Sequence, residues 1–441
     1  MKVLKSTIPA ILLSLAATVP AFSQQSAPTS PAAKPAADDC KSLRQKALLT
    51  GGPDVLRLLA EAQAVCRKSQ QAIARDKQPV PWAVATLDLA NVTADRAIIG
   101  GSGGSGSGGA SMALQGLDEA VDLDRQVLAV LSAEKSPEVW AAAQMNLGSA
   151  LQSRGIRTNG EAGMPYLQEA ADHLRQALQR LDAVKEPQNW AETQNNLGLA
   201  LAELGTRKGK PAGNPLLEEA FQTFGTVQKV YTPEKNLHRW SEARLAQARV
   251  LLALERFNDA DPVLQEVTDK DPDNRRALLT YVSLLGGRLE RPADAASLTA
   301  KWLNRHADDL DVQILNLENL YASGRLAESR IRAVGLSEKA AGLPPAIRIS
   351  LMGYEIATAL ATGSKDAPDH LGSLITLVAA QPADFHIAGN FAGSLRFIQS
   401  RQDLRNSDWQ IQLFHALQNR NGRDAILTDL RKLESDMAGT G

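Results

Sequence analysis

The sequence contains few cysteines, few aromatic residues and almost no net charge. Only two of its 441 residues are cysteines, and aromatic residues make up 4% of the chain. The formal net charge is −1, so no overall basic field attracts the chain to nucleic acid or to an acidic membrane surface. After the N-terminus, no apolar run reaches the roughly 20 residues that a membrane-spanning helix needs. We therefore expect neither a nucleic-acid partner nor a membrane span.

Helix-forming residues dominate the composition instead. Alanine and leucine are abundant, and runs of alternating β-branched residues are hard to find. Because alanine and leucine favour helices and alternation is the main signal of strands, the composition predicts an all-α fold.

The N-terminus has the pattern of a secretory signal peptide. Lys2 and Lys5 form a basic start, "TIPAILLSLAATV" is a short apolar core, and "AFSQ" offers small residues for cleavage after Ser23. The pattern predicts a signal peptide at 1–23 and an exported mature protein, periplasmic or secreted. The Ala- and Pro-rich stretch 24–37 cannot form a helix or a core, and we expect a disordered tail there.

The two cysteines, Cys40 and Cys66, both follow the predicted cleavage point. An exported protein meets an oxidising compartment, so a disulfide is the default interpretation. A helical hairpin over 38–79 that turns at Gly52 brings residue 40 within about one helical turn of Cys66. A redox pair or metal site is disfavoured, since no Cys-x-x-Cys spacing or nearby histidine is present.

Four similar segments recur along the chain, and the best copies are 50 residues apart. "WAAAQMNLGSAL", "WAETQNNLGLAL" and "WSEARLAQARVL" begin at Trp140, Trp190 and Trp240, and a weaker copy begins at Trp82. Amphipathic segments begin at Leu117, Leu167 and Leu217. Each repeat therefore predicts two helices, and stacked hairpins would share one continuous core.

These residues resemble the tetratricopeptide repeat family, in a variant with a long loop. The fourth copy carries the family's spacing of small and large residues at Ala248, Leu251, Ala260, Leu264, Val267 and Pro272. The third copy carries it at Leu197, Gly198, Leu201, Ala220, Phe224 and Val227. The resemblance implies an α-solenoid of stacked helix hairpins wound as a right-handed superhelix.

The repeats also predict how the chain is divided. We expect four repeats over 80–272, further repeats of this type over 273–344, and degenerate helical repeats or a helical cap over 345–441. The run "GGSGGSGSGG" falls between the two helices of the first repeat, in a stretch eight residues longer than in its neighbours. We expect 98–116 to be a disordered loop inside that repeat, not a domain boundary.

No motif in the sequence supports catalysis or metal binding. The glycine run satisfies G-x-G-x-x-G and G-x-S-x-G, but neither the preceding strand nor the partner residues of a dinucleotide site or a nucleophile elbow are present. The six histidines are scattered and none pairs at metal-ligand spacing. We expect no enzyme activity, no catalytic residue, no metal and no cofactor.

The resemblance places the candidate binding site on the concave side, along the first helix of each repeat. There, an asparagine before the Leu-Gly pair can bind a peptide backbone with its donor and its acceptor. This column contains Asp88, Asn146 and Asn196, and Ala246 interrupts it. Further polar candidates for the groove are Gln144, Gln194, Asn195 and Arg249. The alternative is that Asn146 and Asn196 join neighbouring repeats through hydrogen bonds.

The sequence thus predicts an exported scaffold or adaptor of the bacterial envelope that binds a protein or peptide. The alternative is an architectural module that self-associates, as a homo-oligomer, or joins a larger envelope complex. The identity of the partner depends on side chains spread over several repeats, and fold alone does not give it.

Overall fold

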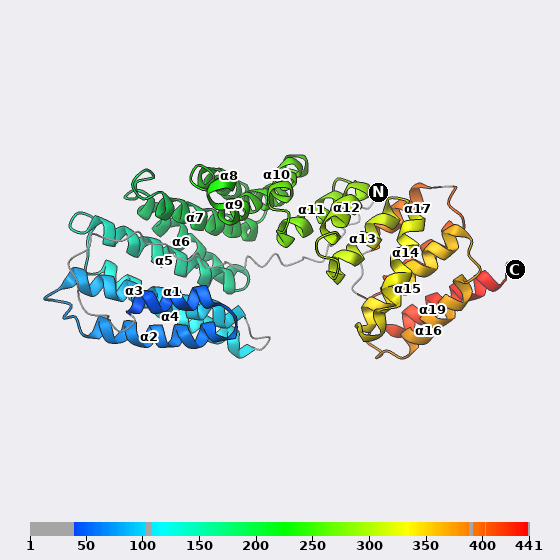
Figure 1. Cartoon of the computed structure of the whole chain (residues 1–441), viewed down its shortest axis with the longest axis horizontal. Helices are drawn as coiled ribbons and strands as arrows, with labels where there is room; N and C mark the ends of the chain where they lie inside the picture. Colours follow the sequence, from blue (N-terminus) through cyan, green and yellow to red (C-terminus); the bar gives the residue numbers. More distant parts are fainter. Residues whose placement is uncertain (1–38, 103–106, 388–390, 402, 440–441) are drawn as a thin grey trace. The chain divides into compact units, whose positions relative to one another are not determined.

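The computed structural model describes residues 39–102, 107–387, 391–401 and 403–439. All regular secondary structure in these residues is helical, and successive helices pack against one another as hairpins (Figure 1). The all-α class and the solenoid of stacked hairpins are therefore confirmed. The predicted signal peptide (1–23) and tail (24–37) lie outside the described residues.

The chain divides into two compact units, which meet in sequence at Glu255 and Arg256. The N-terminal unit contains α1 (Cys40–Thr50), η1 (Gly52–Asp54), α2 (Val55–Gln71), α3 (Pro79–Ser102), α4 (Ser107–Leu128), α5 (Pro137–Arg157), η2 (Gly160–Gly163), α6 (Met164–Leu178), α7 (Pro187–Lys208), α8 (Asn214–Val227) and α9 (Pro233–Ala253). The C-terminal unit contains α10 (Phe257–Lys270), α11 (Arg275–Gly287), α12 (Pro292–Leu303), α13 (Leu310–Ala322), α14 (Leu326–Ser337), η3 (Ala340–Gly342), α15 (Pro345–Thr362), α16 (Ala367–Ala379), α17 (Ala392–Ser400), α18 (Ser407–Leu417) and α19 (Arg423–Ala438). The division falls inside the fourth sequence copy, which supplies α9 and α10.

The N-terminal hairpin is closed by the predicted disulfide. Asp39 caps α1, its side chain accepting a hydrogen bond from the backbone N–H of Ser42. Two glycines with positive φ, Gly51 and Gly52, turn the chain toward α2. The turn sets the Cα atoms of Cys40 and Cys66 4.9 Å apart, and the two sulfurs are bonded. The disulfide prediction is confirmed.

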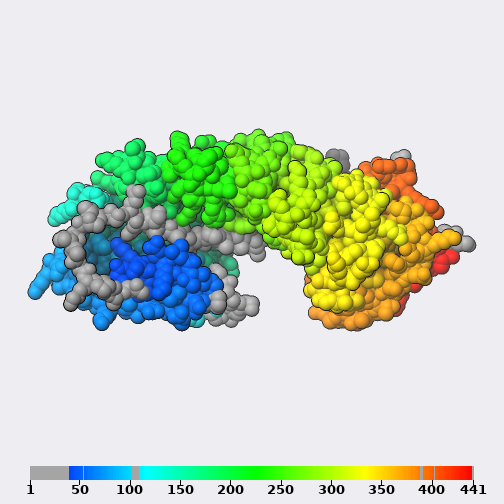
Figure 2. Space-filling model, in the orientation of Figure 1, coloured from blue at the N-terminus to red at the C-terminus, as the bar shows by residue number. Residues whose placement is uncertain are grey.

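Proline and glycine explain why each 50-residue copy folds as a hairpin. The first helices α3, α5 and α7 begin at prolines, where the missing N–H costs no hydrogen bond. Glycine later in the helix lets the second helix approach. A Cβ at Gly148 would lie 2.6 Å from Leu174 Cγ, and one at Gly198 would lie 2.8 Å from Phe224 Cε1. In the space-filling view of Figure 2, the atoms of the green helices α7–α9 form a continuous surface.

An arginine at the same position of two copies connects the ends of successive first helices. Arg207, near the end of α7, donates to the carbonyl oxygens of Gly155 (3.0 Å), Ile156 (3.1 Å) and Thr158 (2.8 Å) at the end of α5. Carbonyls in the last turn of a helix lack the usual donor four residues on, and Arg207 supplies one. The Gly155 carbonyl also accepts from the backbone N–H of Thr158. Arg157 occupies the same position one repeat earlier and reaches the carbonyl oxygen of Ile98 at 3.4 Å.

The glycine-rich run differs from the prediction. Helix α3 continues to Ser102 and α4 already begins at Ser107, so the disordered loop expected over 98–116 is mostly helix; 103–106 lie outside the described residues. Small residues allow this, because a Cβ at Gly101 would lie 2.5 Å from that of Ala113, and one at Gly116 2.7 Å from that of Ala97. The eight additional residues lengthen the two helices, and their contact offsets the poor helix propensity of glycine.

One buried side chain breaks the apolar pattern of the N-terminal unit. Asp124 on α4 is only 1% exposed and occupies the position of Leu174 and Phe224 in the next two copies. Its Oδ1 has no hydrogen-bond partner in the described part of the chain. Burial raises the pKa of this carboxyl well above its usual range.

The C-terminal unit begins as sequential hairpins and then changes its order. Each helix from α10 to α16 packs against the next. After α16, however, α17 packs against α13, while α18 packs against α15 and α19 against α16. The last three helices therefore return to surfaces of earlier hairpins.

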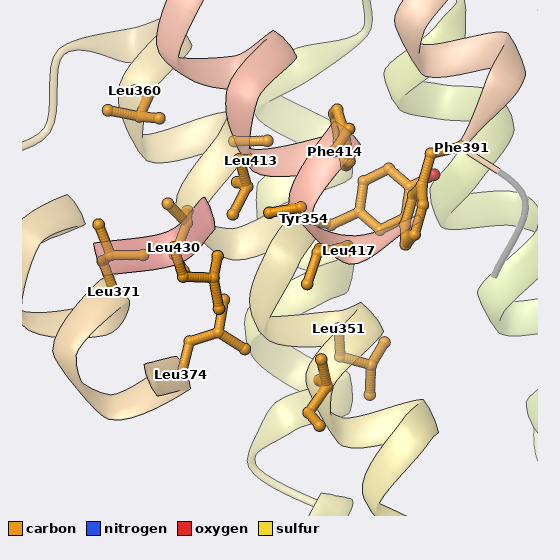
Figure 3. Close-up of a cluster of buried hydrophobic side chains, with 14 of the residues drawn as sticks. Leu351, Tyr354, Leu360, Leu371, Leu374, Phe391, Leu413, Phe414, Leu417 and Leu430 are labelled. Atoms are coloured by element: carbon orange, nitrogen blue, oxygen red, sulfur yellow. The ribbon is translucent and has the colours of Figure 1, made fainter. Parts of the chain in front are cut away.

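An aromatic cluster holds this returning segment in place. Figure 3 shows Tyr354 of α15 beside Phe391 and Phe414, with leucines of α16, α18 and α19 nearby. The ring centroids of Tyr354 and Phe414 are 5.4 Å apart, and those of Phe391 and Phe414 5.0 Å. Tyr321 of α13 joins the cluster through its ring and through a hydrogen bond from its hydroxyl to Gln410. All of these rings are fully or almost fully buried.

Candidate functional site

The first helices of the N-terminal unit form one continuous surface. Helix α3 contacts α5, α5 contacts α7, and α7 contacts α9. On each helix, the positions two, six and thirteen residues after the tryptophan lie on the same side, because they are four and seven residues apart. We call the twelve residues at these positions the first-helix face. They are Val84, Asp88, Asp95, Ala142, Asn146, Ser153, Glu192, Asn196, Glu203, Glu242, Ala246 and Ala253.

The two asparagines of the predicted column have different surroundings. Asn196 donates from Nδ2 to the hydroxyl of Ser149 on α5 at 2.8 Å, which joins two neighbouring repeats. Asn146 is as buried as Asn196, at 7% exposure, but forms no hydrogen bond with the described residues. Ser149 is one turn from Asn146, so both lie toward the same side of α5. The structure thus gives Asn196 a contact between repeats and leaves the amide of Asn146 unpaired.

The acidic end of the column lies beside α1. Asp88 is half-buried, and its carboxylate is 3.7 Å from Nζ of Lys41. Burial raises its pKa, and the charges of Lys41 and Arg44 oppose this only in part. Two turns further along α3, Asp95 is 2% exposed and accepts a hydrogen bond from Nε of Arg44 at 2.5 Å. Helix α1 therefore supplies two cations to the carboxylates of α3.

A second buried carboxylate lies on α7. Glu192 is 6% exposed and is 3.4 Å from the guanidinium of Arg239 on α9. Burial raises its pKa, although Arg239 and the more distant Arg44 both lower it. Beside this pair, burial and the charge of Glu192 raise the pKa of Tyr231 to about 12, so its hydroxyl stays protonated and can donate a hydrogen bond.

Of the other predicted groove residues, only Arg249 lies toward the side of this face. Gln144 is buried against its own second helix, where it bonds Gln176 at 3.0 Å and His173. Gln194 occupies the same repeat position and is half-buried. Asn195 and Arg249 are also half-buried. Asn195 lies at position five after its tryptophan, off this face, whereas Arg249 lies three residues after Ala246, at the position of Ser149, and so lies toward the side of the face.

Sequence reasoning missed the charged residues that dominate the face. Asp95, Glu192 and their partners Arg44 and Arg239 were not among the predicted candidates. Helical periodicity could have found Asp95 and Glu192, since they lie seven residues after Asp88 and four before Asn196. Arg44 could not be found this way, because it lies on α1, outside the copies. Arg239 directly precedes Trp240 on α9, but nothing in the sequence shows that it reaches Glu192.

The described residues contain no group of three or more His, Cys, Asp or Glu side chains that could hold a metal ion. None of the helices in the described ranges is long and apolar enough to cross a bilayer. The tryptophans that open the copies differ in burial: Trp82 and Trp240 are buried, while Trp140 and Trp190 are half-buried.

The stacked hairpins define the chain as an α-helical tandem-repeat protein. No protein-family model matches the sequence, and no curated protein matches it. One similar solved structure is described as a circular tandem repeat protein with novel repeat topology and enhanced subunit contact surfaces. It is 15% identical, covers 91% of this chain and 94% of its own, and has a TM-score of 0.27. Another is yeast Tom70, 13% identical over 91% of this chain and 92% of its own, with a TM-score of 0.26. At these TM-scores, neither adds an argument about function.

Proposed function

We propose that the N-terminal unit binds an extended segment of another protein on its first-helix face. The observation that carries this proposal is Asn146, a residue of that face that is 7% exposed and whose amide forms no hydrogen bond with the described chain. A bound peptide group can pair with this amide, because it offers one donor and one acceptor to the two functions of the asparagine side chain.

The proposal includes the role of an exported scaffold or adaptor of the bacterial envelope, as the tetratricopeptide-like repeats imply. The disulfide between Cys40 and Cys66 supports export, since such bonds persist in oxidising compartments. The proposal also includes cleavage of a signal peptide after Ser23. N-terminal sequencing of the protein isolated from the periplasm is expected to start at Gln24. A start at Met1 would contradict it.

Photocrosslinking in the native envelope tests the binding face. A crosslinking amino acid at Ala142, a half-buried residue of the face, should capture a partner. The matched control is the same substitution at Gln168, an exposed residue of the second helix α6. Asn146→Ala should abolish capture from Ala142 without unfolding, since Asn146 holds no hydrogen bond among the described residues. Equal capture of a partner from Ala142 and Gln168, or unchanged capture from Ala142 in the Asn146→Ala variant, would refute binding on the first-helix face.

The second candidate function is architectural self-association. It is favoured by the exposed apolar residues of α14, where Ile331 is 74% and Val334 37% exposed, one turn apart. Light scattering over a range of protein concentrations distinguishes the two, because a protein that stays monomeric throughout does not assemble with itself.

A further inference from the structure

One helix of the C-terminal unit stands outside the order of the hairpins. Helices α18 and α19 pack against each other and against α15 and α16, so they add a further hairpin to the stack. Helix α17, which is nine residues long, comes between α16 and α18 in the sequence but packs against α13 of an earlier hairpin. It is therefore an insertion between two hairpins, on a surface that the stack alone would leave open.

This helix crosses equivalent positions of successive first helices. Asn274 caps α11 and Asp309 caps α13, so positions counted from the two caps correspond. Gly286 and Tyr321 both lie twelve residues after their caps, and α17 contacts both of them. It also reaches α15, so it lies on one side of three stacked hairpins, where repeat proteins bind their ligands. We call the surface beneath it the α17-binding face, which consists of Gly286, Tyr321, Ala322 and Tyr354.

The contacts on this face are defined in shape and polarity. The ring of Phe397 meets the ring of Tyr321 edge to face, with centroids 5.9 Å apart. The hydroxyls of Ser394 and Tyr354 are 3.0 Å apart and form a buried hydrogen bond. Arg396 donates at 3.1 Å to a carbonyl oxygen in the last turn of α11, which lacks the usual donor four residues on. Each first helix thus offers α17 a distinct contact, apolar on α13 and polar on α11 and α15.

Helix α17 has the residue pattern of a helical ligand. The residues that it buries are Phe391, Ser394, Leu395 and Ile398. Their spacing of three, four and seven residues places them on one side of a helix, as in amphipathic segments that dock on a protein surface. The exposed residues of the helix are Arg396, Gln399 and Ser400. The buried side has the pattern aromatic-x-x-small-apolar-x-x-apolar, and this pattern describes what the α17-binding face accepts.

Docking keeps α17 helical, because the helix has little stability of its own. Helices shorter than about 12 residues are marginal in water, and α17 has nine. Its N-cap residue is Phe391, whose side chain has no acceptor for the first backbone N–H groups, and Gly393 lowers its helix propensity further. A partner helix with a better cap and no glycine would lose less conformational entropy on docking, so it can compete with α17 for the face.

We propose that the α17-binding face is a docking site for a partner protein and that α17 is its internal competitor. The partner supplies an amphipathic helix with the pattern of α17, which takes the place of α17 on α11, α13 and α15. The site lies in the C-terminal unit, so it is independent of the first-helix face. Because α17 is tethered to α16 by a short stretch of chain, its effective concentration at the face is about 1 mM. The face therefore stays closed until a tighter or more concentrated helix displaces α17.

Fluorescence anisotropy with the full chain tests the proposal. The probe is a labelled peptide of residues 391–400 with Gly393→Ala, since a Cβ there would meet Ala322 at an ordinary contact distance of 3.6 Å. An open variant, Leu395→Asp with Ile398→Asp, removes α17 from the face and should bind the probe at least about tenfold more tightly than wild type does. A locked variant, Ala322→Cys with Gly393→Cys, joins α17 to α13, because 3.6 Å lies in the Cβ range of a disulfide. Its oxidised form should not bind the probe, and reduction should restore binding to the wild-type level.

Three controls accompany these measurements. Reduced wild type accounts for opening of the native disulfide, and the exposed pair Gln399→Asp with Ser400→Asp should leave probe binding at the wild-type level. The probe carrying Leu395→Asp and Ile398→Asp should bind none of the chains. If the open variant loses the urea transition of the C-terminal unit, Arg396→Ala serves as the second open variant. This exposed residue donates one hydrogen bond to α11, so its removal should tighten probe binding about two- to tenfold.

Tighter binding to an open variant, together with no binding to the locked form, supports the proposal. If the probe binds neither open variant, or binds the locked form as well as an open variant, α17 is a fixed part of the fold and the proposal is overturned. Neither result bears on the proposed function, which crosslinking from Ala142 tests in the other unit.

Discussion

The two units use the same hairpin but treat its first helices differently. In the N-terminal unit, the first helices carry polar and acidic side chains on one continuous face, and the close contacts are between glycine and a single large residue, as at Gly198 and Phe224. In the C-terminal unit, α17 and α18 return to α13 and α15. The rings packed together at that junction are those of Tyr321, Tyr354, Phe391, Phe397 and Phe414. The N-terminal unit stacks one hairpin on the next throughout, whereas the last helices of the C-terminal unit fold back onto its earlier hairpins.

The difference shows how a repeat protein can end its stack. A terminal hairpin exposes an apolar face that the next repeat would otherwise cover. In the C-terminal unit, the return of α17 to α19 covers apolar surface with residues distant in sequence: Tyr321 and Gln410 are 89 positions apart. The half-buried Glu318 of α13 lies near this junction, and burial raises its pKa to about 8. This unit therefore depends on long-range contacts, whereas the N-terminal unit depends mainly on contacts between sequence neighbours.

The largest expected effect comes from truncating the aromatic junction. Phe414→Ala should destabilise the C-terminal unit by about 3–5 kcal/mol, the usual cost of such a cavity. Because Phe414 contacts the rings of Tyr321, Tyr354 and Phe391, the loss should extend over α13, α15 and α18. Hydrogen exchange measured peptide by peptide would show faster exchange across these helices.

The matched substitution is Phe224→Ala in the N-terminal unit, where the ring packs against Gly198. Its faster exchange should be confined to α7, α8 and the adjoining repeats. If Phe414→Ala were equally local, the contrast between a closed unit and an additive one would fail.

The regular part of the fold could be predicted because the sequence repeats itself. The tryptophan-led copies gave the hairpins, and two cysteines in a short hairpin gave the disulfide. The glycine run was misjudged, since single-residue propensity favours a loop, while contacts such as Gly101 with Ala113 favour helix. Contacts that depend on another element could not be predicted: Gln144 turns to His173 and Gln176, and nothing local shows it.

The asparagine column was visible in the copies, yet only the structure shows that Asn196 reaches Ser149 while Asn146 has no partner among the described residues. Whether the column binds a peptide stays a prediction. One signal in the copies was available and unused: Asp124 stands where Leu174 and Phe224 stand in the neighbouring repeats.

A smaller effect should follow from opening the disulfide of the N-terminal hairpin. Cys40→Ser with Cys66→Ser removes a cross-link between residues 26 positions apart. The chain-entropy estimate for such a loop is about 3 kcal/mol. If the hairpins are additive, the loss should appear as fraying of α1 and α2, with the later hairpins intact. Limited proteolysis should cut near α1 first, and cleavage throughout the N-terminal unit would show that it is more cooperative than we infer.

The smallest effect should come from Asp124, and it should be a gain. Asp124→Leu restores the residue type of the next copy and removes a buried carboxyl whose Oδ1 is unpaired, so the N-terminal unit should gain about 1–3 kcal/mol at pH 7. The pKa of Asp124 is raised in the folded state, so the folded chain binds the proton of this carboxyl more tightly than the unfolded chain does. The stability from this group is then fully present below the ordinary carboxyl pKa of about 3.9 and is lost as the pH rises toward the raised value. The gain from Asp124→Leu should accordingly be larger at pH 7 than at pH 4, measured as the difference in urea midpoints from wild type.

Leu174→Asp, the reverse exchange one repeat later, should destabilise the unit increasingly from pH 4 to pH 7. If Asp124→Leu instead lowers stability at pH 7, the carboxyl has a structural role that its position among the repeats does not reveal.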